Sequence, residues 1–449
     1  MSARMDREDS QAQRPKPLHK KLLGPPYRFG LRLLGRLRPS RVGDLFRWLA
    51  FELGELSRRR NDPRLTVAVD INPFWEPLTG IGWYLHRLLD ELAERDDLAL
   101  RLYGPNLVPS PDLPAPTVRL PSGRAIEVVT YRPPEGTIVP QGWLIRLLRR
   151  LGPILVALDR NRVLFAPNFF LPNRFLLARG HGALVATVHD LAFRHLAWTL
   201  DERTLLDLEE RLDRTAFEAV HLITPSEAVR RELVASGLAG AHRVTAIHHG
   251  PGQPVATAAS PAPAGLPERY VLFVGTLEPR KNLETLLAAW RHRALAGAEA
   301  PKLVLCGKLG WKSEELSAQI RRGESEGWLV ALGYVSAAAL GEVYRRALVF
   351  AFPSRYEGFG LPLLEAAAAG VPLLASDIPV LREVCGDAAH YAATEDPDAW
   401  AVGIRRIADD PALRSELGQR ARARAANFSW ASSAAEHARV FHLSGWGRA

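Results

Sequence analysis

Short apolar runs alternate with amphipathic stretches from residue 65 onward, and this alternation constrains the fold more than any other feature of the chain. Strands that alternate with helices build parallel α/β sheets. The runs contain few polar residues, which is typical of strands buried on both faces. In the first half of the chain, the expected strands lie at 65–71, 98–104, 163–167, 183–190, 221–226 and 243–250.

A segment rich in Pro, Ala and Gly interrupts the alternation at residues 251–269 and indicates a linker. Beyond it, strands are expected at 270–275, 302–307, 328–334, 348–354 and 371–377, and helical patterns follow from about Asp398. We therefore predict an α/β protein with two doubly wound parallel-sheet lobes and a cleft between them. The Pro-rich residues 105–142 are expected to form an irregular surface excursion of the first lobe. The expected divisions are a basic extension at 1–62, a first lobe at 63–250, a linker at 251–268, a second lobe at 269–430 and a C-terminal helix or tail at 431–449.

The net charge of +9 comes from the start of the chain. Residues 1–60 hold 15 Lys and Arg against 6 Asp and Glu, so the rest of the chain is neutral. A nucleic-acid-binding domain would carry its basic patch on the folded body, and we therefore expect no nucleic-acid partner. The two cysteines, Cys306 and Cys385, are too few for a disulfide framework or a cysteine-rich zinc site. With neither a signal-peptide pattern nor a run of about 18 apolar residues, the chain is expected to be cytoplasmic.

Residues 27–56 interleave Leu, Phe and Trp with Arg, and several of their apolar residues recur at helical spacing. Such a segment can lie in the interface of an anionic bilayer, which would place the protein peripherally on the inner face of the cell membrane. It can equally pack on the body of the protein or form a tail. Both interpretations of residues 1–60 stay open.

Ligands of open parallel sheets bind beyond the carboxyl ends of the strands, so the residues that follow each expected strand are the candidates for function. Arg280 and Lys281 follow the strand at 270–275, and Asn282 is a good N-cap for the helix expected after it. Two cations beside the positive end of a helix are unfavourable unless an anion lies between them. A phosphate would accept hydrogen bonds from both side chains and from backbone N–H groups, and we favour this interpretation over two solvated side chains.

Two acidic residues follow the strand at 348–354, with seven residues between them. Glu357 lies in a loop, and Glu365 falls early in a helix in whose first turn Pro362 fits naturally. Gly358 and Gly360 would expose backbone N–H groups between the two acids. Glu365 has an alternative role as a favourable charge near a helix N-terminus. Glu357 has no such structural explanation, so we predict that it contacts a ligand.

The first lobe offers weaker signals. Gly80 and Gly82 permit close backbone approach at the start of an expected helix, although a plain tight turn explains them as well. His189 ends the strand at 183–190 and points into the expected cleft. Asp396 and Asp398 have Asp-x-Asp spacing, but we interpret them as the cap of a helix, and we predict no metal and no cofactor.

The segments FVGTLEPRKN (273–282) and SRYEGFGLPLLEAAAAGVPLLAS (354–376) resemble those of retaining glycosyltransferases of family 4, the glycosyl transferases group 1. The segments TGIGWY, TVHDLAF and ITPSEAVRREL also resemble their counterparts in that family. The resemblance covers about residues 65–430. It implies the GT-B architecture, in which two Rossmann-like lobes hold a nucleotide-sugar donor in the cleft between them.

The resemblance also implies roles for the matching residues. Arg280 and Lys281 would hold the donor diphosphate, Glu365 the ribose hydroxyls, and Glu357 and His189 the donor sugar. The remaining substrate contacts that it implies are Gly80 and Gly82 near the diphosphate and acceptor, Gly275 and Thr276 before the cationic pair, Gly333, Tyr334 and Val335 at the nucleobase, and the backbone of Gly358, Phe359, Gly360 and Leu361.

The reaction that the resemblance implies is a retaining, metal-independent sugar transfer to a glycan or lipid-linked acceptor in cell-surface polysaccharide synthesis. TLEPRKN together with VHDLAF is similar to members that use GDP-mannose, and UDP- and dTDP-sugars remain alternatives. A catalytically inert nucleotide-sugar-binding scaffold of the same fold is the competing non-enzyme interpretation. Nucleotide-sugar epimerases have a similar shape, but the Arg280–Lys281 and Glu357–Glu365 pairs argue against them.

Overall fold

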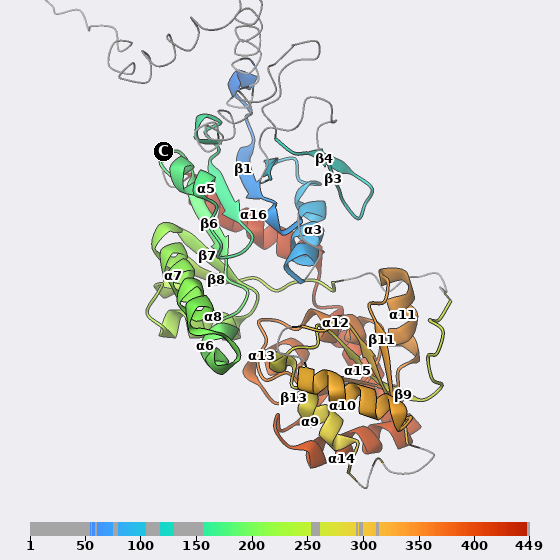
Figure 1. The fold of residues 1–449 in the computed structure, drawn as a ribbon. Coiled ribbons are helices and arrows are strands. Elements are labelled where there is room, and N and C mark those ends of the chain that lie inside the picture. Colours follow the sequence, from blue (N-terminus) through green and yellow to red (C-terminus); the bar gives the residue numbers. More distant parts are fainter. Residues whose placement is uncertain are drawn as a thin grey trace, which may run out of the picture.

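The computed structural model describes residues 54, 56–58, 61–74, 80–104, 117–129, 156–252, 261–292, 295, 300–310 and 314–446. Within these residues the chain forms two lobes, each built on a twisted sheet with helices packed on it (Figure 1). Most of the amphipathic segment expected at 27–56 lies outside the described residues, which include only positions 54 and 56 of that segment. Among the described residues, no helix is both long and apolar enough to cross a bilayer.

In the first lobe, six strands of the described chain form a parallel sheet in the order β2-β1-β5-β6-β7-β8. These strands are β1 (Leu65–Asp70), β2 (Leu98–Tyr103), β5 (Val163–Ala166), β6 (Ala183–Thr187), β7 (His221–Thr224) and β8 (Val244–Ala246). The helices of this lobe are α3 (Gly80–Leu92), α5 (Asn173–Ala178), α6 (Ala192–His195), α7 (Glu202–Glu218) and α8 (Glu227–Ala235), with short 3-10 turns η2 (Asn72–Phe74), η3 (Ala197–Thr199) and η4 (Ala241–Arg243).

In the second lobe, six described strands form a second parallel sheet in the order β11-β10-β9-β12-β13-β14. They are β9 (Tyr270–Val274), β10 (Lys302–Cys306), β11 (Leu329–Gly333), β12 (Val349–Phe352), β13 (Leu373–Ser376) and β14 (Ala389–Ala392). The helices of this lobe are η5 (Pro279–Lys281), α9 (Leu283–Ala289), α10 (Glu314–Ser325), α11 (Ala337–Arg346), α12 (Leu361–Ala368), α13 (Pro379–Cys385), α14 (Pro397–Asp409) and α15 (Pro411–Ala425). One more helix, α16 (Trp430–Trp446), follows them in the chain.

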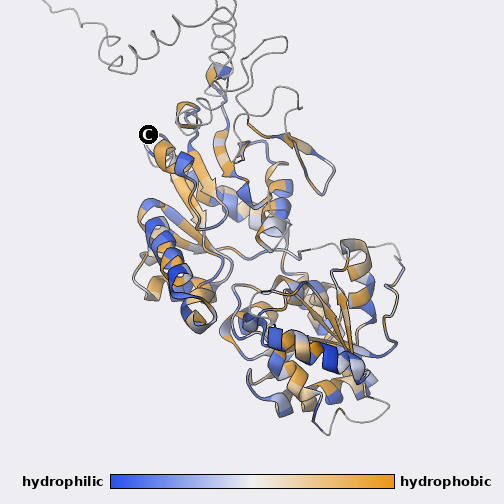
Figure 2. Ribbon diagram, in the orientation of Figure 1, coloured by the Kyte–Doolittle hydropathy of each residue, from blue (hydrophilic) through white to orange (hydrophobic). Residues whose placement is uncertain are grey.

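The strands are the apolar layer of each lobe. Every residue of β1, β5, β6, β12 and β13 is buried. Figure 2 shows these strands in orange and the outer faces of α7 and α10 largely in blue. Helices therefore cover both faces of each sheet, as the continuous apolar runs indicate, and the prediction of two parallel α/β sheets is confirmed.

Two parts of the sheet structure were not expected from the sequence. The antiparallel pair β3 (Thr117–Arg119) and β4 (Ala125–Glu127) lies within the excursion predicted to be irregular. Its six residues are exposed or half-buried, so no apolar run marks the hairpin. Strand β14 has the sequence AHYA at the sheet edge, where partial exposure removes the need for a purely apolar run.

The last helix returns to the first lobe. In Figure 1, α16 (red) lies against the strands and α3 of that lobe. Its residues Trp430, Ala434, Ala438 and Phe441 are buried in one core with β1, β5 and α3. The hydroxyl of Tyr84 on α3 lies 3.0 Å from Nε2 of His437. The first lobe is thus completed by residues at the far end of the chain.

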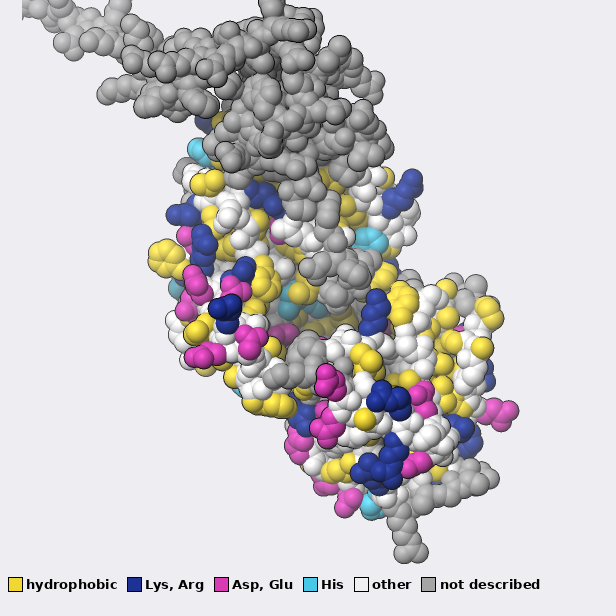
Figure 3. Space-filling model, in the orientation of Figure 1, with side chains coloured by type: hydrophobic (Ala, Val, Ile, Leu, Met, Phe, Trp, Pro, Cys, Tyr) yellow, Lys and Arg dark blue, Asp and Glu magenta, His cyan; other side chains and the backbone are white. Residues whose placement is uncertain are grey.

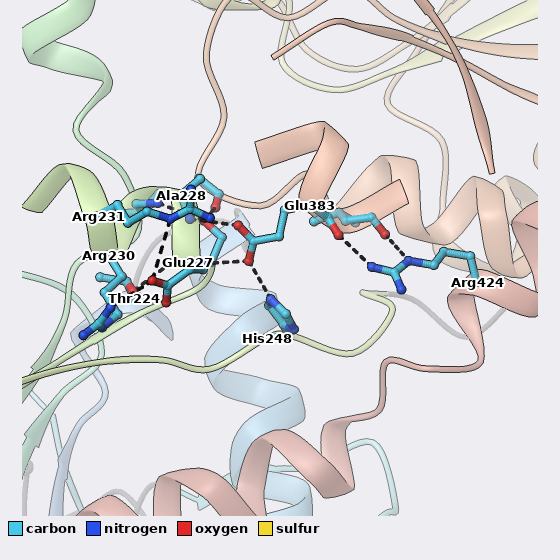
Figure 4. A network of polar contacts seen from close by, with 12 residues as sticks. Thr224, Glu227, Ala228, Arg230, Arg231, His248, Glu383 and Arg424 are labelled. Atoms are coloured by element: carbon cyan, nitrogen blue, oxygen red, sulfur yellow. Dashed lines mark hydrogen bonds and ion pairs between the residues drawn. The ribbon is translucent and has the colours of Figure 1, made fainter. Parts of the chain in front are cut away.

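Polar contacts join the two lobes. The Glu383 carboxylate of α13 accepts hydrogen bonds from the backbone N–H groups of Glu227 (2.7 Å) and Ala228 (2.8 Å) at the start of α8. It also lies 2.7 Å from Nε2 of His248 (Figure 4). Arg424 of α15 donates to the backbone carbonyls of Glu383 and Val384, which fixes this end of α13 from behind.

Candidate functional site

Loops that follow β6, β9 and β12 meet between the lobes. Figure 3 shows a hollow in the surface between the two lobes, with histidine side chains (cyan) inside it. Arg280, after β9, donates to the Asp190 carboxylate, after β6, over 3.4 Å. A β-carbon on Gly358, after β12, would overlap the carbonyl oxygen of His189. Glycine is therefore required where the loop of one lobe passes the backbone of the other.

A buried cluster of opposite charges lies at this meeting point. Lys281 Nζ is 2.5 Å from Glu357 Oε1, and Arg280 NH1 is 3.6 Å from Glu357 Oε2. Arg280 Nε also donates to Glu278 over 2.9 Å. The side chains of Lys281 and Glu357 are 8% and 6% exposed. The structure thus brings Glu357 to the adjacent residues Arg280 and Lys281, which lie more than 70 residues earlier in the sequence.

Burial and charge act in opposite directions on this cluster. Burial alone raises the pKa of Glu357, but the charges of Lys281 and Arg280 outweigh it, so the pKa is lowered and the carboxylate stays ionised. For Lys281, burial lowers the pKa more than Glu357 raises it. For Arg280, burial again lowers the pKa, but Glu357, Asp190 and Glu278 raise it further. The site holds two cations whose charge is balanced by carboxylates in the absence of a ligand.

The loop that carries the two cations is held by Asn282. This residue occupies the N-cap position of α9 as predicted, but its side chain makes no capping hydrogen bond, contrary to expectation. Its backbone is left-handed, with φ 53° and ψ 38°. The amide nitrogen instead donates to the carbonyls of Pro353 (3.1 Å) and Thr394 (2.8 Å). The side chain therefore fixes the position of η5 relative to β12 rather than capping the helix.

The glycine-rich loop leads directly into α12. Gly360 is the N-cap residue with φ 97°, a conformation that favours glycine, and Pro362 lies in the first turn as predicted. Phe359 is buried, and the Gly358 carbonyl accepts from the Ser226 hydroxyl of the first lobe over 2.8 Å. The loop is thus anchored on both sides, with Leu361 opening the helix.

Glu365 is the fifth residue of α12, so it lies beyond the first turn, where a favourable interaction with the helix dipole would be strongest. Its Oε2 accepts a hydrogen bond from the Tyr344 hydroxyl over 2.8 Å. Burial and the Glu365 carboxylate raise the pKa of Tyr344 well above its usual value, so the hydroxyl remains a donor. A β-carbon on Gly252 would overlap Glu365 Oε1. The carboxylate therefore lies between α11 and the segment that connects the lobes.

His189 is buried at the end of the first-lobe strand. Its Nε2 lies 2.7 Å from the carbonyl oxygen of Pro167, which can only accept, so Nε2 carries the hydrogen. Burial lowers the pKa of His189, and the ring is therefore neutral with Nδ1 as an acceptor. The ring packs against Tyr84 with centroids 4.8 Å apart.

The other predicted residues lie at the ends of strands or at the start of a helix. Gly80 and Gly82 flank Ile81, which lines a cavity together with His189, Asp190 and Arg280. Gly275 and Thr276 directly follow β9. Gly333, Tyr334 and Val335 lie at the end of β11, which is two strands away from β9 in the sheet. An extended ligand would be needed to contact both places.

Several partnerships at the site were not predicted from the sequence, although Asp190 was expected beside His189 at the end of its strand. Glu278 and Asp190 are carboxylate partners of Arg280, and Tyr344 holds Glu365. Gly307 accommodates the Gly275 carbonyl, which a β-carbon would overlap, and its N–H donates to Gly333 over 2.8 Å. Gly307 is the last residue of the strand expected at 302–307. Its place at the carboxyl end of that strand could have marked it as a candidate site residue. Among the described residues, no three His, Cys, Asp or Glu side chains are grouped so as to hold a metal ion.

Comparisons with known proteins cover most of the chain. Residues 78–251 match the model of Glycosyltransferase Family 4, and residues 260–424 match that of Glycosyl transferases group 1. The chain is 30% identical over 392 residues to O-antigen chain mannosyltransferase B of Escherichia coli, covering 83% of this chain and 98% of the relative.

Solved structures share the fold. Sucrose-phosphate synthase from Thermosynechococcus elongatus has a TM-score of 0.65 at 21% identity, covering 85% of this chain and 99% of the other. Anabaena HepE, in complex with UDP and glucose, has a TM-score of 0.60 at 16% identity, covering 85% and 100%. Both have the same two-lobed architecture as this chain.

Proposed function

The chain belongs to the family 4 glycosyltransferases, also described as glycosyl transferases group 1, and we propose that it transfers mannose from GDP-mannose to a glycan or lipid-linked acceptor. We further propose that the transfer retains the anomeric configuration, needs no metal ion and serves cell-surface polysaccharide synthesis. The observation that carries this proposal is the buried cluster of Arg280, Lys281 and Glu357 between the lobes. The mannosyltransferase relative supports mannose as the sugar.

Arg280 and Lys281 are proposed to bind the diphosphate of the donor. When the bond between the anomeric carbon and the phosphate breaks, negative charge develops on the leaving nucleoside diphosphate. Cations held in place before the reaction stabilise that charge without reorganising. Arg280 is fixed by Glu278 and Asp190, and Lys281 by Glu357, so both are oriented before a donor arrives.

Glu357 is proposed to stabilise the sugar as it gains oxocarbenium character. Its lowered pKa keeps it ionised, which is the form that stabilises positive charge. Both of its oxygens lie near cations in the free enzyme, which supports a positioning and charge-stabilising role rather than that of a nucleophile. His189 Nδ1 would accept from a donor-sugar hydroxyl, and Glu365 would accept from the ribose hydroxyls.

The glycine loop and the lobe contacts are proposed to complete the site around the donor. Backbone N–H groups from Gly358 to Leu361 would surround the sugar and phosphate, and Gly275, Thr276, Gly80 and Gly82 would line the diphosphate. The backbone near Gly333, Tyr334 and Val335 would contact the base. Contact between the lobes would exclude water, which otherwise hydrolyses the donor.

The proposal is tested by a screen of GDP-, UDP- and dTDP-sugars in EDTA, with and without membrane-lipid extract as acceptor. We expect release of GDP from GDP-mannose, and loss of that release in Glu365→Ala. Release of UDP or dTDP from its sugar nucleotide instead would identify that sugar nucleotide as the donor in place of GDP-mannose. A folded protein that binds nucleotide but releases none with any donor or extract would support the inert scaffold.

A further inference from the structure

A cavity of about 310 Å³ opens beside the charged cluster. It is lined from the first lobe by His189, Asp190 and a set of apolar side chains, and from the second lobe by Glu278 and Arg280. The apolar set includes Ile81, Phe169, Phe193, Leu196, Leu200 and Leu208. The cavity therefore has a charged edge next to the proposed reaction centre and an apolar wall that extends into the first lobe.

The apolar wall offers few hydrogen bonds to a ligand. The Thr199 hydroxyl, which lines the cavity, already donates to the Leu196 carbonyl over 2.6 Å. The side-chain oxygen of Asn168 accepts from the backbone N–H of Phe170 over 2.9 Å. A polar group such as a sugar ring buried deep in the cavity would leave hydroxyls unsatisfied, which is unfavourable. The chemistry of the wall favours a hydrocarbon group.

The charged edge of the cavity disfavours an anion. Among the described residues that line the cavity, Arg280 carries the only permanent positive charge. That guanidinium is already paired with Glu278 (2.9 Å) and Asp190 (3.4 Å) and is assigned above to the donor diphosphate. A phosphate carried by the acceptor at this edge would face two carboxylates without a cation of its own. An uncharged acceptor fits the edge better.

We propose that this cavity holds the aliphatic chain of a neutral glycolipid acceptor, which is joined without a phosphate to the sugar that receives the new residue. This inference rests on the proposed sugar transfer and specifies its acceptor. The receiving hydroxyl lies at the edge formed by His189, Asp190 and Arg280, and the first part of the chain packs on the apolar wall. A cavity of this volume is at the lower end for ligand pockets, so it takes the part of the chain nearest the sugar.

The test compares two mannosides that differ only in their aliphatic chain, with a disaccharide as a sugar-only comparison. Methyl α-mannoside, octyl α-mannoside below its micelle concentration, and an uncharged mannobiose are compared as acceptors with the donor found in the screen. Direct binding of each is also measured by calorimetry without donor. Each buried methylene group strengthens binding about fourfold, so the octyl glycoside is expected to exceed the methyl glycoside by at least about tenfold in kcat/KM and in affinity.

Three variants test where the aliphatic chain of the acceptor binds. Leu208→Gln makes the wall polar and Ala192→Phe fills the cavity. Leu206→Gln is the matched control, because Leu206 lies on the same helix with 62% exposure and does not line the cavity. We expect Leu208→Gln and Ala192→Phe to remove most of the octyl preference while the KM for donor and the use of methyl mannoside stay unchanged. Melting temperatures show whether either wall variant has a folding defect. If one of them does, the other still tests the cavity assignment.

The outcomes separate this inference from the proposed function. Equal use and equal binding of methyl and octyl mannoside by the wild-type protein would overturn the inference. So would a preference for mannobiose that Leu208→Gln reduces, because a glycan would then occupy the cavity. Absence of transfer with every donor would contradict the proposed function alone. Calorimetric binding of octyl mannoside that Leu208→Gln weakens and Leu206→Gln leaves intact would still support the cavity assignment.

Discussion

Each charged residue of the cluster has an opposite charge within reach before any substrate arrives. Lys281 is paired with Glu357, while Arg280 contacts Glu278, Asp190 and Glu357. The loss of either cation therefore leaves a carboxylate without one of its partners. Arg280 has a 22% exposed side chain and three carboxylate partners, whereas Lys281 is the nearer of the two cations beside the buried Glu357.

Arg280→Ala is expected to lower kcat about a hundred- to thousandfold, because one preorganised stabiliser of the leaving group is lost. The melting temperature should also fall, because Glu278, whose side chain is 5% exposed, loses its cation. Steady-state kinetics and thermal unfolding measure the two quantities, with Arg322→Ala, an exposed arginine on α10, as the control. Near-normal turnover in Arg280→Ala would contradict the diphosphate assignment.

Lys281→Ala is expected to lose turnover on the same scale and also to lower the free energy of unfolding. Removing the lysine leaves the Glu357 carboxylate buried beside a single cation at 3.6 Å. Breaking one partner of a buried pair typically costs about 3–5 kcal/mol. Denaturant unfolding measures this loss. The double variant Lys281→Ala/Glu357→Gln should recover stability but not turnover, and recovery of turnover would be inconsistent with a role for Lys281 in the reaction.

Tyr344 orients Glu365 and does not itself need to contact the substrate. Tyr344→Phe removes the hydrogen bond to Glu365 Oε2, and we expect the KM for donor to rise about threefold to tenfold with little change in kcat. Tyr391→Phe is the matched control, since it removes a hydroxyl that donates to the Gly386 backbone carbonyl in the same lobe. A change in kcat without a change in KM would argue against the ribose role of Glu365.

Single residues also show how far the sequence could define the site. Arg280, Lys281, Glu357 and Glu365 were predicted as site residues because they follow expected strands, and the structure brings the first three together. The partners Glu278, Asp190 and Tyr344 could not be assigned, because each pairing depends on how loops or helices pack. Asn282 shows the same limit, since tertiary contacts with Pro353 and Thr394 replaced the capping bond that local sequence favours.

At the scale of elements, the contact between α13 and α8 holds one lobe against the other. The Glu383 carboxylate lies where the N-terminus of α8 exposes its free N–H groups and where the helix dipole favours a negative charge (Figure 4). None of the residues in this contact is itself a proposed substrate contact, although Ser226, next to Glu227, donates to the Gly358 carbonyl. Changing Glu383 therefore tests lobe association without removing a proposed substrate contact.

Glu383→Gln is expected to weaken lobe association by about 1–2 kcal/mol, since an amide can accept from one N–H but brings no charge. Small-angle X-ray scattering should show a larger radius of gyration for the substrate-free variant. Glu416→Gln, an exposed glutamate on α15, is the matched control. Unchanged scattering in Glu383→Gln would show that other contacts hold the lobes together.

The same contact predicts a pH dependence. Burial alone raises the pKa of Glu383, but the hydrogen bonds from His248 and from the N–H groups of Glu227 and Ala228 outweigh it, so the pKa is lowered. A lowered pKa means that the contact stabilises the associated lobes above the usual pKa of a glutamate and is lost as the pH falls through the lowered value. The radius of gyration of the wild type should rise in that acid range. The difference between wild type and Glu383→Gln should disappear there, and a difference that persists would contradict this assignment.

The elements also differ in how well the sequence predicted them. The eleven expected strands all contain a strand of the structure, because burial on both faces of a parallel strand leaves a clear apolar run. The hairpin β3–β4 and the edge strand β14 are partly exposed and leave no such run. The position of α16 could not be predicted either, since its periodicity marks a helix but not the lobe on which it packs.

For the whole molecule, α16 makes the stability of the first lobe depend on the C-terminal end of the chain. Phe441 is fully buried against Phe165 of β5, with ring centroids 5.1 Å apart. Phe441→Ala is expected to lower the free energy of unfolding of the first lobe by about 3–5 kcal/mol, as for other large core truncations. Denaturant unfolding followed by circular dichroism measures this change. Leu443→Ala, at a position 66% exposed on the same helix, should have little effect, and similar losses in both variants would contradict the core assignment.

The return of α16 to the first lobe has a consequence for biosynthesis. The ribosome releases β8 at residue 246 but completes α16 only at residue 446, and at ordinary elongation rates the interval is about 10 to 40 seconds. Throughout that time the apolar face of the first lobe formed by β1, β5 and α3 lacks α16, the helix that later packs on it. Chaperones that bind exposed apolar surface would have their longest opportunity there, and the second lobe can finish folding before the first.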